Sequence, residues 1–171
     1  SNPTIAPYVG DGDVVVRVTA AAASAAEAET LLEPAVEAIR ARLGDHLYAT
    51  HGETMEEVVA QRLIARHLRI ATAESCTGGL IAARLVGVSG ISAVFERGYV
   101  VYADSAKQAE LGVSAETLAN HGAVSAETAR EMVSGLMERT GCDVAVAVTG
   151  IAGPDGGTAG KPVGLVYAAV R

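Results

Sequence analysis

Residues 69–86, RIATAESCTGGLIAARLV, decide how the larger part of the chain folds. The run Arg69–Ala73 is short and apolar, which is typical of a buried strand, whereas Gly79–Val86 spaces its apolar residues as a helix does. Between them lie one charge, two reactive side chains and a pair of glycines. A strand that enters a helix through a tight glycine turn is the repeating unit of an α/β sheet.

The same alternation of strands and helices continues to the end of the chain. We predict further strands at Gly98–Tyr102, Val144–Thr149 and Val163–Val170, and helices at 55–68, Ser105–Leu111 and Ala126–Thr140. The runs VAVAVT and GLVYAAV hold small apolar residues almost without interruption, which is typical of strands covered on both faces. Residues 51–171 are therefore expected to form an α/β domain, with helices on both faces of a largely parallel sheet.

The first 50 residues predict a separate, smaller unit. DVVVRVTAAA, from Asp13, favours a strand, and a helix follows that begins at Ser24 and ends at Gly44. Pro34 lies inside this helical pattern and is expected to kink or break it. Because HLYA, residues 46–49, favours a second strand, the expected order is a small β-α-β (α+β) unit over 1–50. It holds no cluster of acids, histidines or cysteines, so we assign it no chemistry.

Composition limits the classes of partner. The chain has 171 residues, half of them hydrophobic, and a net charge of −7. This charge argues against a nucleic-acid or membrane-surface partner, although helix N-termini and backbone N–H groups can still bind one small anion. The two cysteines are too few for a disulfide scaffold, and no apolar run has the length of a membrane span. We expect a cytoplasmic protein.

The turn after Ala73 is the first candidate site. Ser75 precedes Gly78 and Gly79, so its hydroxyl can stand exposed beside backbone N–H groups that would face an oxyanion. The same serine can equally be an ordinary helix cap, and this stretch alone leaves both interpretations open. The neighbouring Cys76 is expected to be a buried structural thiol.

A nucleophilic serine needs a base, and the four histidines offer little support for one. His121, for example, falls in ANHGAVS, residues 119–125, which we expect to be a loop. The chain has only two lysines, of which Lys107 follows the strand that ends at Tyr102. A desolvated lysine can lose its proton near neutral pH, whereas an arginine cannot. Taken alone, Lys107 is also consistent with a solvated surface lysine.

The third candidate segment is TGIAGPDGG, from Thr149, which follows a predicted strand. Successive N–H groups in such a loop can bind an anion, and a flexible surface turn is the alternative. The loop is not a Walker A motif, and no strand–GxGxxG–helix arrangement or metal-ligand spacing is present. We therefore expect no metal and no cofactor, with Glu74 and Asp155 as orienting groups only.

Four motifs in order carry a resemblance to a known family. TAESCTGGLIAARL, ISAVFERGYVVYADSAKQAELGV, LANHGAVSAETAREM and VAVTGIAGPDGG…KPVGLVY resemble the C-terminal domain of the competence- and damage-inducible protein CinA, over about 54–170. That domain also occurs alone as nicotinamide mononucleotide deamidase. The preceding residues are similar to the small linking domain of full-length CinA.

The resemblance implies hydrolysis of the carboxamide of nicotinamide mononucleotide to nicotinic acid mononucleotide and ammonia. By motif it assigns Ser75 as nucleophile and the pair Lys107 and Tyr102 as base and orienting group, without deciding which of the two is the base. Substrate binding would fall to Thr77, Gly78 and Gly79 at the oxyanion and to Thr149, Gly150, Ala152 and Gly153 at ribose and phosphate.

The resemblance also implies a homo-oligomer, commonly a dimer. Family members continue past the strand near Val170 with a basic stretch and a closing helix, so we expect 51–171 to be truncated at its C-terminus. The alternative function is a non-catalytic module that binds a pyridine nucleotide or a protein partner.

Overall fold

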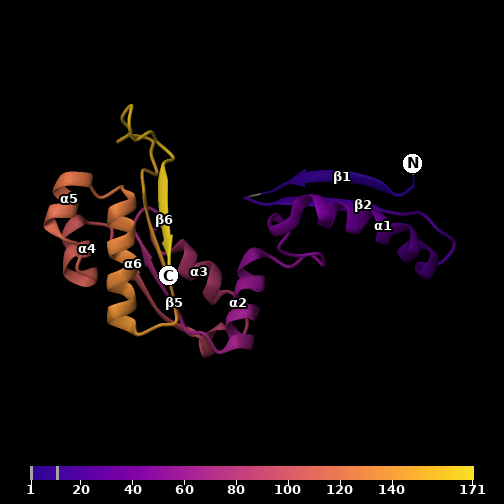
Figure 1. Ribbon diagram of the computed structural model, residues 1–171, viewed down its shortest axis with the longest axis horizontal. Helices are drawn as coiled ribbons and strands as arrows, with labels where there is room; N and C mark the ends of the chain where they lie inside the picture. Colours follow the sequence, from indigo (N-terminus) through magenta and orange to yellow (C-terminus); the bar gives the residue numbers. More distant parts are fainter. Residues whose placement is uncertain (1, 11) are drawn as a thin grey trace. The chain divides into compact units, whose positions relative to one another are not determined.

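The computed structural model describes residues 2–10 and 12–171, which fall into two compact units, 1–52 and 53–171 (Figure 1). Each unit is described here by itself. The larger unit is an α/β domain, as the sequence predicts. Its elements are α2 (Met55–Arg66), β3 (Ile70–Glu74), α3 (Leu80–Val86), the 3₁₀ turn η2 (Ile91–Ala93), β4 (Phe95–Val100), α4 (Asp104–Leu111), α5 (Ala115–His121), α6 (Ala126–Thr140), β5 (Val144–Gly150) and β6 (Val166–Val170).

The sheet of the larger unit has the order β4-β3-β5-β6. Strand β3 is parallel to both neighbours, and Glu74 lies opposite Val100 of β4 and Val148 of β5. Only β6 is antiparallel, paired with β5 through a long loop. The carboxyl ends of β3, β4 and β5 therefore meet at one edge of the sheet, where open α/β sheets bind their ligands.

Helices cover the two faces of this sheet, with α4, α5 and α6 on one side and α2 and α3 on the other (Figure 1). Because side chains alternate along a strand, β3 contributes Ala71 and Ala73 to the α6 side and Ile70 to the α3 side. Small strand residues allow α6 to pack closely. Its Met132 is fully buried, and replacing such a side chain with alanine costs about 2–5 kcal/mol.

Helices α4 and α6 cross at very short range. A Cβ atom at Gly135 of α6 would lie 1.7 Å from the carbonyl oxygen of Leu111. No side chain fits in that space, so glycine is required there for close approach of the two backbones.

The smaller unit has the order β-β-α, so the expected β-α-β order was wrong. Strand β1 (Thr4–Val9) pairs antiparallel with β2 (Val14–Thr19), and α1 (Ala25–Leu43) follows. Residues 44–46 form the 3₁₀ turn η1 (Gly44–His46), and 47–49 form no strand. Strand β1 was not predicted, because it contains Pro7 and proline within an apolar run argues against a strand.

Helix α1 continues through Pro34 instead of breaking there. Proline removes one backbone donor from the helix interior. The helix nevertheless has 19 residues, an N-cap hydrogen bond from Glu27 N–H to Ser24 Oγ, and a C-terminal glycine, and these features favour its continuation.

Helix α5 was not predicted, because 119–125 was expected to be a loop. The helix has only seven residues, too few for a clear periodic pattern, and the Ser114 hydroxyl caps it by accepting from Thr117 N–H.

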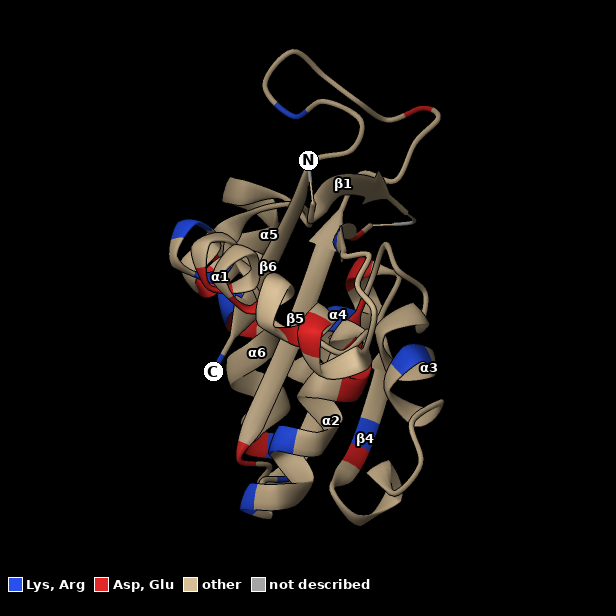
Figure 2. Cartoon of the chain, turned by 90° about the vertical axis from the view of Figure 1, so that its right-hand side faces the viewer, with Lys and Arg blue, Asp and Glu red and all other residues tan. Residues whose placement is uncertain are grey.

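Acidic and basic residues are interspersed over the helices and β4 rather than gathered by sign (Figure 2).

Candidate active site

The turn between β3 and α3 is held at both ends. At its start, the Ser75 N–H donates to the carbonyl of Val148 at 3.0 Å, which extends the β3–β5 pairing by one residue. Within it, the Gly78 N–H donates to the Ser75 carbonyl at 3.2 Å. Gly78 and Gly79 have φ values of 60° and 104°, which favour glycine over other residues.

The Glu74 side chain holds the other end of this turn, at the start of α3. Its side chain is 1% exposed, and its carboxylate accepts hydrogen bonds from the N–H groups of Gly79, Ile81 and Ala82 at 3.1, 3.0 and 2.9 Å. A hydrogen bond to a charged group contributes about 1.5–3 kcal/mol. Glu74, and not a serine or threonine, satisfies the N-terminus of α3.

Two of the three N–H groups expected to face an oxyanion are therefore engaged within the protein. Gly78 N–H is bound to Ser75 and Gly79 N–H to Glu74. Over the part of the chain that the structure describes, the N–H groups of Cys76 and Thr77 have no acceptor. The turn thus offers these two groups to a ligand, and Cys76 N–H was not anticipated.

Ser75 does not cap α3. The helix begins at Leu80, and no side chain makes a capping hydrogen bond at its N-cap, Gly79. Ser75 is 7% exposed, and its hydroxyl makes no hydrogen bond to any residue in 2–10 or 12–171. A nearly buried hydroxyl without a structural partner is available for chemistry.

Lys107 is buried at the tip of the neighbouring strand. It is 1% exposed, and its Nζ donates to the carbonyl oxygens of Val101 at 3.0 Å and Tyr102 at 2.8 Å. The interpretation of Lys107 as a solvated surface lysine is therefore wrong. Helix α4 begins just after these two carbonyls, so a lysine in its first turn folds back onto them.

Burial lowers the pKa of the Lys107 amine below its ordinary value, because the charged form loses its hydration. Asp104, whose Oδ1 lies 3.7 Å from Nζ, opposes this by favouring the ammonium form, as does the Cys76 side chain more weakly. Asp104 is well exposed, so water screens much of its effect.

Ser75 and Lys107 follow neighbouring parallel strands and so lie at the same edge of the sheet, and side-chain alternation along β3 assigns Ser75 to the face that α4 covers. Ala71 and Ala73 face the α6 side, and the bond from Ser75 N–H to β5 continues that alternation to Ser75. Helix α4 lies on this side as well, with Ala106 packed against the same core cluster. In this structure the amine and the hydroxyl make no hydrogen bond to each other, and catalytic contacts are often looser without substrate.

Tyr102 lies at the same edge but contributes differently from Lys107. Its side chain is 73% exposed, and the group that contacts the Lys107 amine is its backbone carbonyl. The phenol is therefore open to an incoming ligand rather than packed within the site.

Cys76 is half-buried, so the expectation of a buried thiol was wrong. Cys142 is buried, and neither cysteine forms a disulfide. A Cβ at Gly150 would lie 3.0 Å from the Cys76 sulfur and 2.8 Å from the Leu165 carbonyl oxygen. Gly150 thus allows the β5 tip to approach the turn after β3, which brings these two candidate segments together.

The segment expected to bind ribose and phosphate begins at Thr149. This residue is buried, and its hydroxyl donates to the Ala123 carbonyl at 2.8 Å, so it anchors the α5–α6 connection. Ala152 is exposed and Gly153 partly exposed. Gly153 has φ 85°, and a Cβ there would lie 2.5 Å from Val163, so the loop folds back tightly on the turn that precedes β6. The predicted strand Val163–Val170 begins only at Val166.

Lys161 fixes the same loop from its far side. Its Nζ donates to the carbonyls of His121 at 2.6 Å and Val124 at 2.7 Å. The sequence indicated only that this lysine was rare. Its partners lie about 40 residues away, and no local pattern links them.

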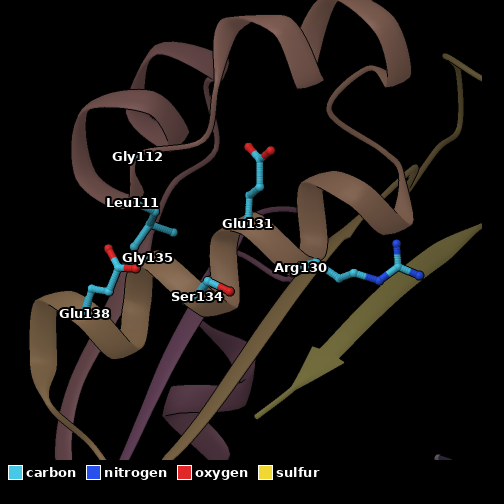
Figure 3. Close-up of a pocket in the computed structure, with 7 residues that line it drawn as sticks. All are labelled: Leu111, Gly112, Arg130, Glu131, Ser134, Gly135 and Glu138. Carbon is cyan, nitrogen blue, oxygen red and sulfur yellow. The ribbon is translucent and has the colours of Figure 1, made fainter.

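A surface hollow of about 330 Å³ lies elsewhere, over the crossing of α4 and α6 (Figure 3). It is lined by Leu111, Gly112, Arg130, Glu131, Ser134, Gly135 and Glu138. None of these residues belongs to the turn after β3 or to the β5–β6 loop. The chemistry is better assigned to the strand edge, where the buried amine and the unpartnered hydroxyl lie.

Within 2–10 and 12–171, no group of three or more His, Cys, Asp or Glu side chains is placed to hold a metal ion. Among those residues there is likewise no helix long and apolar enough to cross a membrane.

Comparison with known proteins identifies relatives of both units. Residues 52–171 match the CinA C-terminal domain, and 1–49 match the damage-inducible protein CinA KH domain. A Clostridium novyi protein described as competence-damage inducible is 51% identical over 170 residues, 99% of this chain and 41% of that protein. A CinA-like protein of Kosmotoga olearia is 50% identical over 166 residues, 97% of this chain and 40% of that protein.

Among solved structures, the competence/damage inducible protein CihA of Agrobacterium tumefaciens is 49% identical, with a TM-score of 0.65 over 72% of this chain and 77% of that one. The chain spans about two fifths of the length of the two curated relatives. None of the three names states a reaction. The extent of these matches shows that the chain belongs to the CinA family.

Proposed function

We propose that the larger unit hydrolyses the carboxamide of nicotinamide mononucleotide, with Ser75 as nucleophile and Lys107 as general base. The observation that carries this proposal is the burial of Lys107 at the strand edge that also holds an unpartnered serine hydroxyl. A serine paired with a lysine of lowered pKa is a known type of activated nucleophile.

The two backbone hydrogen bonds of Lys107 are compatible with the neutral form of its amine, although the nearby Asp104 carboxylate favours the ammonium form. A neutral amine has two N–H donors and one lone pair, and the carbonyls of Val101 and Tyr102 accept two hydrogen bonds. Loss of the third proton therefore leaves no buried donor unsatisfied and frees the lone pair. This supports Lys107 rather than Tyr102 as the base.

In the first half of the reaction, Ser75 Oγ attacks the carboxamide carbon while its proton passes to Lys107 Nζ. The N–H groups of Cys76 and Thr77 bind the oxyanion. The carbon–nitrogen bond then breaks, Lys107 returns the proton to the leaving nitrogen, and ammonia departs. In the second half, water attacks the acyl-serine and Lys107 takes the proton of the water. Lys107 then returns that proton to Ser75 Oγ as nicotinic acid mononucleotide leaves.

The remaining predicted residues act on the substrate. The exposed Tyr102 phenol orients the carboxamide, and the 149–153 segment binds ribose and phosphate through its backbone. The N-terminus of α3 is unsuited to the phosphate, because Leu80 N–H donates to the Thr77 carbonyl and the next two N–H groups donate to Glu74. We further propose that the protein acts as a homo-oligomer.

The test is ammonia release from nicotinamide mononucleotide by the intact protein and by its Ser75→Ala variant. We expect the variant to lose at least about 1,000-fold in kcat while it still binds the nucleotide. Free nicotinamide in place of the nucleotide should react far more slowly, because it lacks the phosphate. Equal rates from wild type and variant would refute the mechanism, and binding without turnover by wild type would indicate a non-catalytic module.

A further inference from the structure

One buried charge takes no part in the mechanism above. Glu74 is 1% exposed, lies next to Ser75, and contacts no positively charged side chain among the described residues. A carboxylate is rarely buried unless its oxygens are fully used. Here three backbone N–H groups use them, from Gly79, Ile81 and Ala82.

These bonds join the end of β3 to the start of α3 directly. Oε2 accepts from Gly79 and Ile81, and Oε1 accepts from Ala82, so both oxygens are needed. Only the four residues 75–78 separate the two joined points. Ser75 N–H is itself fixed to Val148, so the conformation of this short turn is determined from both sides.

The consequence concerns the N–H groups in the middle of the turn. Glu74 takes the Gly79 N–H, and the Ser75 carbonyl takes the Gly78 N–H. The two N–H groups left without acceptors, those of Cys76 and Thr77, directly follow the serine. The direction of these two N–H groups depends on the hydrogen bonds that Glu74 and the Ser75 carbonyl make at Gly79 and Gly78.

We propose that Glu74 is a positioning residue that sets the direction of the Cys76 and Thr77 N–H groups and thereby forms the oxyanion site. This inference rests on the proposed function, because it assumes that Ser75 acylates. Glu74 touches neither substrate nor reacting atoms; it acts through the backbone of the turn.

The variant that tests the proposal is Glu74→Gln. Glutamine keeps the volume and one acceptor oxygen but turns an NH₂ group toward an N–H that needs an acceptor. Glu110→Gln is the matched control, because Glu110 is exposed on α4 and its side chain makes no hydrogen bond or ion pair with the residues described. Both variants are made in the intact protein.

Five quantities are compared with those of wild type: kcat, KM, the inhibition constant of the aldehyde analogue of the substrate, the affinity for nicotinic acid mononucleotide, and the thermal midpoint. The aldehyde forms a hemiacetal with Ser75 whose oxyanion needs the same two N–H groups. We expect Glu74→Gln to lower kcat about 30-fold with KM changed less than threefold, since losing an oxyanion donor outright costs about 100- to 1,000-fold. Aldehyde affinity should fall by the same factor, and affinity for nicotinic acid mononucleotide should not change.

If Glu74 has only a structural role, Glu74→Gln will lower the thermal midpoint of unfolding but will leave kcat and aldehyde affinity unchanged when they are measured well below that midpoint. This result would overturn the proposal. If Glu74→Gln does not fold, Glu74→Asp, which keeps the charge but shortens its reach, is judged by the same criteria. Wild type and Ser75→Ala are assayed alongside. If wild type is inactive or Ser75→Ala is fully active, the proposed function falls and this inference with it. If only Glu74→Gln behaves as wild type, this inference alone falls.

Discussion

The two lysines of the chain make similar contacts in different surroundings. Lys107 at the β4 tip and Lys161 in the β5–β6 loop each donate to two backbone carbonyls. Lys107 is almost completely buried, whereas Lys161 is only partly buried. Burial lowers the pKa of the Lys107 amine, as the proposed general base requires. The two lysines share their residue type and the kind of partner they bind, and they differ in solvent access, which is the property on which the proposed role of Lys107 depends.

The largest effect is expected from replacing the buried lysine. Lys107→Arg keeps a positive charge and hydrogen-bond donors but cannot release a proton, so kcat for ammonia release should fall about 100- to 10,000-fold. Lys161→Arg is the matched control and should retain most of its kcat. Similar losses in both variants would mean that the two lysines play the same, purely structural part.

A smaller and different effect is expected at the partly buried lysine. Lys161→Met removes the hydrogen bonds to the carbonyls of His121 and Val124 and so loosens the loop proposed to bind ribose and phosphate. Ordering that loop on binding then costs more, and KM should rise about 10-fold with kcat nearly unchanged. A fall in kcat at unchanged KM would place Lys161 in the chemistry instead.

Tyr102 separates a side-chain role from a backbone role. Tyr102→Phe removes the phenol but keeps the carbonyl that accepts from the Lys107 amine. We expect kcat/KM to fall about 10-fold through lost substrate orientation, while the acid limb of its pH profile stays in place. A displaced acid limb would contradict this, since it would show that the phenol sets the protonation of the lysine.

The smallest effect is expected at Asp104, which raises the pKa of the Lys107 amine against the effect of burial. Asp104→Asn removes this carboxylate, so the pKa falls further and the neutral amine persists to lower pH. The acid limb of kcat/KM should therefore move to lower pH. Because Asp104 itself is exposed, water screens its interaction with the buried amine, and such a screened interaction is worth about 0.2–1 kcal/mol, so the movement should be about 0.1–0.7 pH units. A move toward higher pH would exclude Lys107 as the titrating base.

Much of the larger unit could be predicted from local sequence. The helix Ala126–Thr140 was predicted with the bounds it has, since its apolar spacing and capping serine are both local signals. The meeting of Ser75, Lys107 and Gly150 at one edge also followed from the order of strands and helices. Parallel strands place their carboxyl ends together whatever the details of their side chains.

What could not be predicted depends on contacts between distant or irregular segments. The Lys161 bonds to the α5–α6 connection span 37 and 40 residues. The three N–H groups that Glu74 accepts depend on the dihedral angles of the turn, so the sequence suggested only an orienting group there. In the smaller unit, the strand Thr4–Val9 was hidden by Pro7, and its pairing with β2 is a tertiary contact.

The close crossing of α4 and α6 links Gly135 of α6 to the helix that carries Lys107. Leu111, whose carbonyl touches Gly135, lies one helical turn after Lys107 on the same helix. A single added methyl group, as in Gly135→Ala, would push α4 outward and draw the amine away from the two carbonyls that hold it. Glycine at position 135 would then be required for activity as well as for folding.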